Sequence, residues 1–227
     1  MLDFSKQLCS AGAFFVATLD KCIAGGIGAN FDIMRIMKKI VLDLETQKEF
    51  AEVGGRSAYS KLRVSVCGIY SYAQDQYLCF DETTLVRLGE LLQGADQVIG
   101  YNIKQFDFQV LQPYFNFSMT SVPALDILEE IEKVLGHRIR LDAVAQTTIG
   151  AGKTGTGLGA ISLWKSGRID ELKSYCLSDV KLTRELYEYA LREGKLLYQD
   201  FFEVREIPIK IIEPAARIDA LVQSSLF

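Results

Sequence analysis

The sequence predicts an α/β fold, in which a three-strand meander and then parallel strands form a mixed central sheet flanked by helices. Apolar runs rich in β-branched and aromatic residues come early in the chain, and amphipathic helical patterns come late. The chain has 227 residues, of which 49% are hydrophobic, which is enough for one ordinary domain with a sizeable core. Early strands followed by helices that cover them are typical of this class.

Three early runs predict the meander. KKIVLDLE at 38–45 is a strong strand pattern, and RVSVCGIYSY at 63–72 and QYLCF at 76–80 are two more. The polar stretch AQDQ at 73–76 predicts the turn between the second and third strands.

The later patterns predict the helices that cover the sheet. Leu85, Leu88, Leu91 and Leu92 lie on one side of a helix that ends near Gly94. The other expected elements are a short strand at 95–102, a helix at 105–115 that a proline limits, an extended piece and helix at 122–137, a short helix at 141–150, a flexible loop at 151–159, a long helix at 168–194 and a strand at 205–214.

The start of the chain differs from the rest. MKKIVLDLET begins at Met37 and leads straight into the first strand, so we expect residues 1–36 to be an extension or a mis-called start. A helical appendage that packs on the domain is the alternative. Residues 37–205 would form the domain, and residues 206–227 a C-terminal strand with a loose tail.

Charge and composition argue against several classes of protein and of functional site. The net charge of -4 argues against a broadly basic surface for nucleic acid, although bound cations would change the balance near a site. The 5 cysteines contain no CxxC pair, which favours a reducing cytoplasm over a disulfide framework or a zinc site. His137 is the only histidine, so a histidine-dependent triad would rest on it alone. No apolar run reaches the ~18 residues of a membrane span.

Two carboxylates interrupt the first strand pattern. Residues two apart in a strand point to the same side, so Asp43 and Glu45 project together. Two like charges side by side repel, and their burial costs several kcal/mol unless a cation compensates. The pair is therefore either a cation site or an exposed strand end.

Two later segments carry further candidates. Asp107 follows an aromatic residue at the start of a predicted helix, where it either serves a site or caps the helix. Tyr175 and Asp179 are four residues apart in the long helix and hence on the same face. The alternative for this second pair is a surface position.

Taken together, these segments resemble the three motifs of the DEDD superfamily of 3′–5′ exonucleases. DLE at 43–45 matches the Asp-x-Glu motif, and NIKQFD at 102–107 resembles the form found in proofreading domains of family B DNA polymerases. YCLSD at 175–179 matches the Tyr-x-x-x-Asp motif of the DEDDy branch. The similarity extends over about residues 37–195, and residues 161–190 also resemble prokaryotic RNase H-like proteins related to helicase-associated domains.

The resemblance implies an RNase H-like fold and a two-metal hydrolysis of phosphodiesters at the 3′ end of single-stranded DNA or RNA. Two divalent cations, Mg²⁺ or Mn²⁺, suit ligands that are all oxygen atoms. The metal ligands that the resemblance implies are Asp43, Glu45, Asp107 and Asp179, and Tyr175 would orient the attacking water.

Two further residues are candidates for substrate binding. Thr46 could donate to the terminal nucleotide, or it could be a simple strand-end threonine. Asn102 would either fix the loop before Asp107 or contact the scissile nucleotide.

Two other functions stay open beside the exonuclease. One is a nuclease for short oligoribonucleotides or for particular nucleic-acid structures. The other is a nucleic-acid-binding module that works with a helicase partner and cleaves little. The complete acidic set favours the enzyme.

Overall fold

The computed structural model describes residues 37–152 and 157–212, all of which belong to one compact unit. The extension expected at residues 1–36 lies outside the described residues, and so does the expected tail beyond residue 212.

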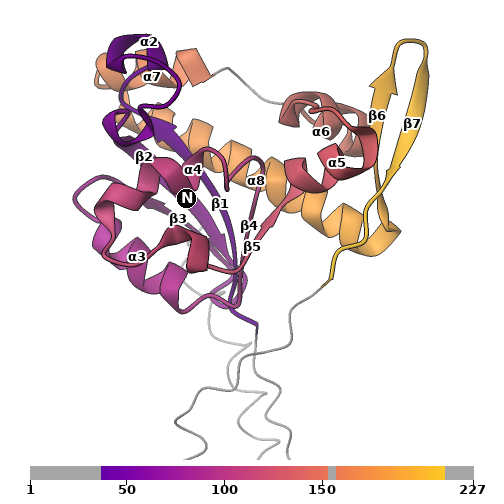
Figure 1. The fold of residues 1–227 in the computed structure, drawn as a ribbon, viewed down its shortest axis with the longest axis horizontal. Helices are drawn as coiled ribbons and strands as arrows, with labels where there is room; N and C mark the ends of the chain where they lie inside the picture. The colour runs from indigo at the N-terminus through magenta and orange to yellow at the C-terminus, as the bar shows by residue number, and fades with distance from the viewer. Residues whose placement is uncertain (1–36, 153–156, 213–227) are drawn as a thin grey trace, which may run out of the picture. The chain divides into compact units, whose positions relative to one another are not determined.

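A mixed five-stranded sheet lies at the centre of the fold, with the strand order β3-β2-β1-β4-β5 (Figure 1). The first three strands form the predicted antiparallel meander, and β4 and β5 extend the sheet in parallel with β1. The predicted fold class is therefore confirmed. The strands are β1 Lys39–Thr46, β2 Val64–Ser71, β3 Gln76–Phe80, β4 Gln97–Gly100 and β5 Ala124–Asp126.

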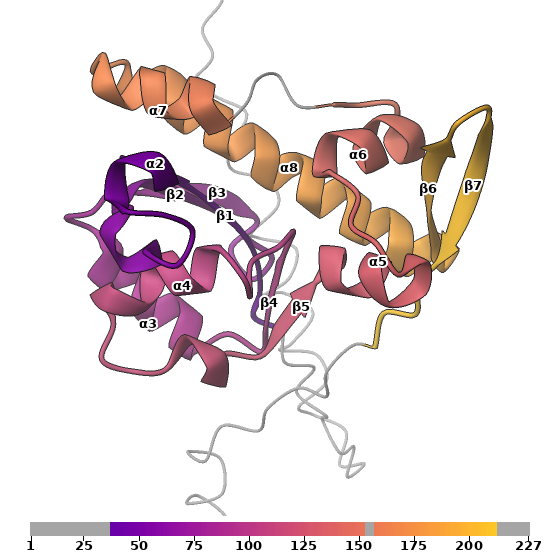
Figure 2. The same ribbon diagram turned by 45° about the horizontal axis from the view of Figure 1, so that its top comes forward.

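Helices α3 and α4 cover one face of the sheet (Figure 2). Leu42 and Leu44 of β1 point into this layer, together with Leu88 and Leu92 of α3. The elements on this side or near its edge are α2 Phe50–Val53, η1 Tyr59–Lys61, α3 Leu85–Gln93, α4 Asp107–Leu111, η2 Gln112–Tyr114 and η3 Met119–Ser121.

The long helix α8 crosses the opposite face (Figures 1 and 2). Val41 of β1 packs there with Val180 and Leu186 of α8, as the alternation of side chains along a strand requires. The elements on this side are α5 Ile127–Leu135, α6 Leu141–Ile149, α7 Gly157–Lys165, α8 Ile169–Glu193, β6 Lys195–Asp200 and β7 Glu203–Pro208.

Two local expectations differ from the structure in their bounds. Gly157 and Gly159, expected in a flexible loop, lie in the first turn of α7, where buried Ala160 packs near Leu172 of α8. Tertiary packing here overrides the low helix propensity of glycine. The strand expected at 205–214 is present as β7, but it begins at Glu203, ends at Pro208 and pairs with an unpredicted strand, β6.

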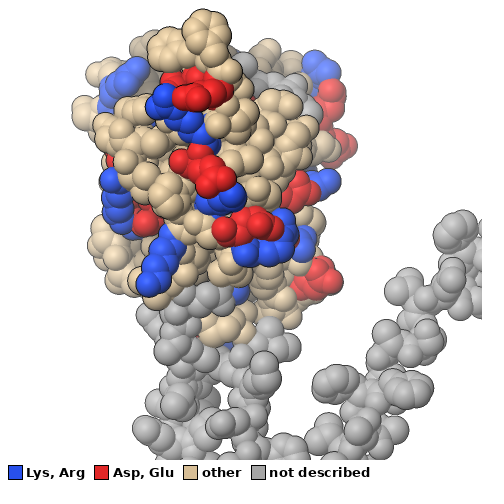
Figure 3. Space-filling view, turned by 90° about the vertical axis from the view of Figure 1, so that its right-hand side faces the viewer, with Lys and Arg blue, Asp and Glu red and all other residues tan. Residues whose placement is uncertain are grey.

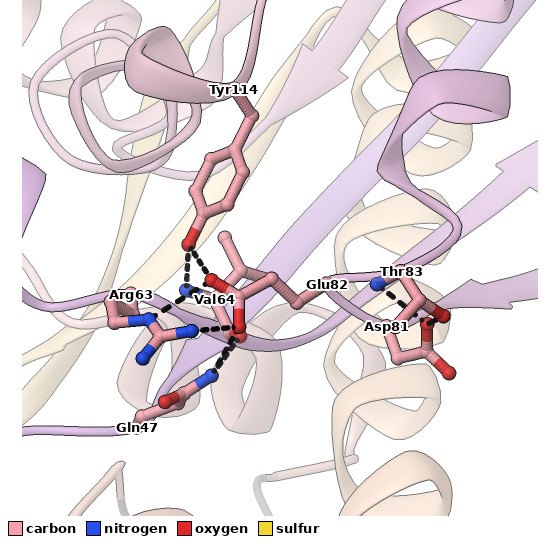
Figure 4. A network of polar contacts seen from close by, with 7 residues as sticks. All are labelled: Gln47, Arg63, Val64, Asp81, Glu82, Thr83 and Tyr114. Atoms are coloured by element: carbon pink, nitrogen blue, oxygen red, sulfur yellow. Dashed lines mark hydrogen bonds and ion pairs between the residues drawn. The ribbon is translucent and has the colours of Figure 1, made fainter.

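A polar network fastens the ends of the meander (Figure 4). Glu82, just after β3, accepts hydrogen bonds from Arg63, Gln47 and Tyr114. Tyr114 also accepts a hydrogen bond from the backbone N–H of Val64 at the start of β2. The segments after β1 and β3 and the start of β2 are thereby held together at the end of β1 that carries the carboxylates.

None of the helices in the described part of the chain is both long enough and apolar enough to cross a bilayer.

Candidate active site

The two carboxylates of β1 face α8. Val41 packs in the layer that contains α8, and Asp43 and Glu45 follow it at even spacing on the same strand. Glu45 is 8% exposed and Asp43 is partly buried. The exposed strand end, which was the alternative for this pair, does not describe these positions.

A glycine allows α8 to approach the sheet closely at this point. Gly68 of β2 lies opposite Asp43 in the antiparallel register. A Cβ atom on Gly68 would lie 3.0 Å from Sγ of Cys176 and 3.1 Å from Cγ2 of Val180, both on α8. Cys176 Sγ also lies 3.5 Å from the carbonyl oxygen of Asp43, to which it donates. The helix segment that carries Tyr175 and Asp179 is thus pressed against β1.

Three carboxylates meet where β1 and α8 come together. One oxygen atom from each of Asp43, Glu45 and Asp179 lies within 4.8 Å of the others. Asp179 is completely buried and Tyr175 is 9% exposed, so neither occupies the surface position that was their alternative. Buried carboxylates at this spacing repel one another strongly in the absence of a cation. Their oxygen-only chemistry therefore fits a hard divalent cation such as Mg²⁺ or Mn²⁺.

Asp107 approaches the same region from the other layer. Its Oδ1 atom accepts a hydrogen bond from the backbone N–H of Leu44 at 3.0 Å. The pairing of β1 with β4 ends at Val41 and Ile99, so Asp107 provides an acceptor for β1 beyond the end of β4. Burial raises the pKa of the Asp107 carboxyl well above its ordinary value, and the nearby Asp43 carboxylate raises it further. Asp107 lies near the group of three carboxylates without being part of it.

A cleft of about 570 Å³ opens over these carboxylates. Its wall includes the β1 end, the α2 segment, the start of α4 and the first turns of α7. Six of the seven residues that the sequence singled out line this cleft, and Asp179 lies buried behind it in contact range of Asp43 and Glu45. The six are Asp43, Glu45, Thr46, Asn102, Asp107 and Tyr175.

The two predicted substrate-binding residues already have intramolecular bonds. Thr46 Oγ1 donates to the carbonyl oxygen of Lys48 at 2.9 Å. Asn102 has a left-handed backbone with φ 70°, and its side-chain oxygen accepts a hydrogen bond from Arg138. Contact of either residue with a nucleotide stays a prediction.

Sequence reasoning missed Asp126, which shapes the wall of the cleft. This carboxylate is 2% exposed and lies at the end of β5, beside the end of β4. It accepts from the backbone N–H groups of Asn102 at 2.8 Å and of Lys104 at 3.1 Å. The pattern DILE at 126–129 signals a helix N-cap, and Asp126 does accept from Leu128 N–H in α5. The neighbouring sequence gives no sign that Asp126 also holds the loop before Asp107.

Aromatic rings form one wall of the cleft. Phe106 contacts Phe50 and Tyr59 edge to face, with ring centroids 6.1 Å apart in each pair. Phe50 and Phe106 both line the cleft, whereas Phe108 is buried in the core. Such rings offer apolar surface at the edge of an acidic site.

A family model of the RNase H superfamily matches residues 40–191. The chain belongs to the RNase H superfamily. The matched region begins in β1 and ends in α8, and so contains all seven predicted site residues.

A solved structure has a similar fold. It is the family B DNA polymerase of the hyperthermophilic archaeon Pyrobaculum calidifontis, with a TM-score of 0.52 and 16% sequence identity. The match covers 69% of this chain and 25% of the polymerase chain. At this identity the likeness concerns the fold alone. No curated protein sequence matches the chain.

Proposed function

We propose that this member of the RNase H superfamily is a metal-dependent 3′–5′ exonuclease that hydrolyses phosphodiester bonds at the ends of single-stranded nucleic acid. One observation carries the proposal: the Asp43, Glu45 and Asp179 carboxylates gather within 4.8 Å under an open cleft. The 3′–5′ direction and the DEDDy assignment rest on the resemblance of the three sequence motifs.

The residues at the cleft have different proposed roles in metal binding and in orienting water. Asp43, Glu45 and Asp179 would hold two divalent cations, with Asp107 as a further ligand at the edge of the group. Such cations, when bound, stabilise the charge that develops on the attacking and leaving oxygens of a phosphodiester. Tyr175, on the cleft wall, would orient the attacking water through its hydroxyl.

The volume and the lining residues of the cleft suit the end of a single strand. Its volume of about 570 Å³ falls within the range of roughly 300–1,000 Å³ that is usual for small-ligand sites. Lys48 and Arg56 on its wall could contact phosphates, and Phe106 could stack on a base. In this proposal Thr46 and Asn102 contact the terminal nucleotides.

A nuclease assay tests the proposal. Single-stranded DNA and RNA labelled at the 5′ end would be incubated with the full chain in Mg²⁺, Mn²⁺ or EDTA. We expect a metal-dependent ladder that shortens from the 3′ end and that Asp43→Asn abolishes. Glu90→Gln, which changes an exposed carboxylate of α3, is the matched control and should cleave normally.

Other results of this assay would contradict the proposed function. Cleavage that persists in Asp43→Asn, or that ignores EDTA, would contradict the metal-dependent assignment. A folded, metal-binding wild type that binds single strands without cleaving them would favour the accessory module. In that case the helicase partner, which stays a prediction, becomes the next thing to test.

A further inference from the structure

A second hollow lies next to the cleft. It has a volume of about 340 Å³ and lies between the segment that joins α5 to α6 and strand β6. Two arginines and a histidine from that segment line it, and a half-buried tyrosine and a glutamine from β6 form the other side. These residues are His137, Arg138, Arg140, Tyr198 and Gln199, and Asp200 of β6 also lines the hollow.

Arg138 connects this hollow to the cleft. Its guanidinium donates to the side-chain oxygen of Asn102, which lines the cleft, and to Oε1 of Gln105 at 2.6 Å. Both acceptors are neutral amides. Within the described residues, Arg138 forms no ion pair with a carboxylate, so its positive charge is available to an anion.

The carboxylates near the second hollow already have cationic partners. Asp142 is bonded to Arg140, and Asp200 on β6 is paired with Arg205 at 2.9 Å. The Arg140 side chain is 81% exposed, and Asp142 accepts from its Nε and Nη2 atoms, so within the described residues Nη1 is the atom that a phosphate can reach. Because Arg140 is paired with Asp142, the uncompensated positive charge beside the cleft is that of Arg138, in contrast to the acidic floor of the cleft.

The surface around the hairpin favours a specific contact over a diffuse one. Figure 3 looks at the side of the molecule that carries β6 and β7, where acidic and basic side chains are interspersed on the face in view. A strand bound near this side would be held by particular arginines, because the described residues on the face in view form no broad basic patch that could attract it.

We propose that this second hollow is a nucleic-acid subsite, in which Arg138 and Arg140 bind phosphates of the single strand several nucleotides before its cleaved end. The inference rests on the proposed function and extends it, because it names the path by which the strand leaves the cleft: past Asn102, over Arg138 and toward β6. Arginine suits this task because its planar guanidinium can bind phosphate oxygens in a bidentate manner. The consequence is a preference for strands long enough to reach from the cleft to β6.

The test compares a trinucleotide with a 12-nucleotide single strand. Arg138→Gln and Arg140→Gln would each be measured for cleavage in the otherwise wild-type chain and for binding, by fluorescence anisotropy, in the Asp43→Asn background. We expect KM and Kd for the 12-mer to rise at least five-fold more than those for the trinucleotide. The slope of log Kd against log salt for the 12-mer should fall by about 0.7 for each phosphate that the variant no longer binds. Arg192→Gln, at the far end of α8, is the control and should change neither substrate.

The outcomes separate this inference from the proposed function. Equal losses for the two lengths with an unchanged salt slope would overturn the subsite, because Arg138 would then act only by holding Asn102. No effect on either length would overturn it as well. A wild type that cleaves neither strand would refute the exonuclease, yet the anisotropy measurements on the 12-mer would still decide whether the arginines bind phosphate.

Discussion

A single buried carboxylate, Asp126, holds the wall of the cleft by hydrogen bonds alone. It accepts from two N–H groups of the loop before α4 and from two at the start of α5. An amide at this position keeps one acceptor oxygen and adds two donors, which would face N–H groups that are themselves donors. The loop before α4 and the start of α5 would therefore lose part of the hydrogen bonding that both receive from residue 126.

Asp126→Asn should reduce stability by about 1–3 kcal/mol, because it leaves buried N–H groups without an acceptor. We expect cleavage to fall as well, with faster hydrogen exchange at the amides of Asn102 and Lys104. Asp81→Asn is a matched control: Asp81 accepts from the N–H groups of Thr83 and Thr84, away from the cleft. Normal exchange at Asn102 in Asp126→Asn would show that the loop does not depend on this carboxylate.

The proposed role of the Tyr175 hydroxyl can be tested by removing that one atom. Its ring packs with Cys176 and Leu172, so Tyr175→Phe keeps the packing and removes only the hydroxyl. We expect the single-turnover cleavage rate to fall about 10-fold or more, because the water loses its orientation, while affinity for Mn²⁺ changes little. Tyr189→Phe, on the same helix, should cleave at the normal rate. An unchanged rate in Tyr175→Phe would remove the hydroxyl from the reaction.

At the scale of elements, the distance between α8 and the sheet decides whether the carboxylates meet. At Gly68 the helix lies so close to the sheet that an added side chain would press on Cys176, Leu177 and Val180. Gly68→Ala followed by Gly68→Val should therefore weaken Mn²⁺ binding in steps, with the larger residue costing about 1–3 kcal/mol of stability. Isothermal titration calorimetry and thermal melts would measure the two effects.

Gly94→Ala is the control for this series. Gly94 ends α3, its φ is -85°, and the nearest atom to an added Cβ is 3.5 Å away, which is an ordinary contact. The Mn²⁺ affinity of Gly94→Ala should match that of the wild type. A Gly68→Val protein that is less stable but binds Mn²⁺ normally would show that Asp179 does not depend on this close approach.

The network around Glu82 makes the ends of the meander sensitive to acid. The hydrogen bond from Arg63 lowers the pKa of Glu82 below its ordinary value of 4.5, against the opposing effect of burial, and Tyr114 and Gln47 add to the lowering. A lowered folded-state pKa means that the stabilisation is complete above pH 4.5 and is lost as the pH falls through the folded-state value.

Glu82→Gln should therefore melt at a lower temperature than the wild type at pH 7, and the difference should shrink as the pH falls below 4.5. Thermal melts across this range would measure it. Glu130→Gln, which removes an exposed pair with Lys133 on α5, should leave the pH dependence almost unchanged. Parallel curves for Glu82→Gln and the wild type would show that Glu82 does not titrate in the folded state as its contacts indicate.

For the whole molecule, the proposed metal site in the clustered carboxylates would couple metal binding to stability. A cation that binds only the folded chain stabilises it by about 2.7 kcal/mol at a concentration 100 times its Kd. We therefore expect Mn²⁺ to raise the melting temperature of the wild type after EDTA treatment. Asp43→Asn should melt higher than the metal-free wild type, since mutual repulsion of about 1–3 kcal/mol is relieved, and should respond less to Mn²⁺. An equal Mn²⁺ response in the two proteins would place the metal elsewhere.

Local patterns in the sequence were sufficient to predict much of this molecule. Apolar runs rich in β-branched and aromatic residues predicted the meander, and helical periodicity predicted α3, α5 and α8. Spacing along one strand or one helix predicted which candidates share a face, and the resemblance to the DEDD motifs joined the acidic residues and the tyrosine into one set.

Features that depend on segments far apart in the chain became visible only in the folded molecule. The fold brings Asp179 to Asp43 and Glu45, and it leaves Asp107 at the edge of that group as an acceptor for Leu44. It also makes a helix of the glycine-rich start of α7 and a strand of β6, whose Leu197 exchanges hydrogen bonds with Thr148 of α6. The physical reason is the same in each case: the partner that supplies the packing or the hydrogen bond is not a neighbour in sequence, and no local pattern records it.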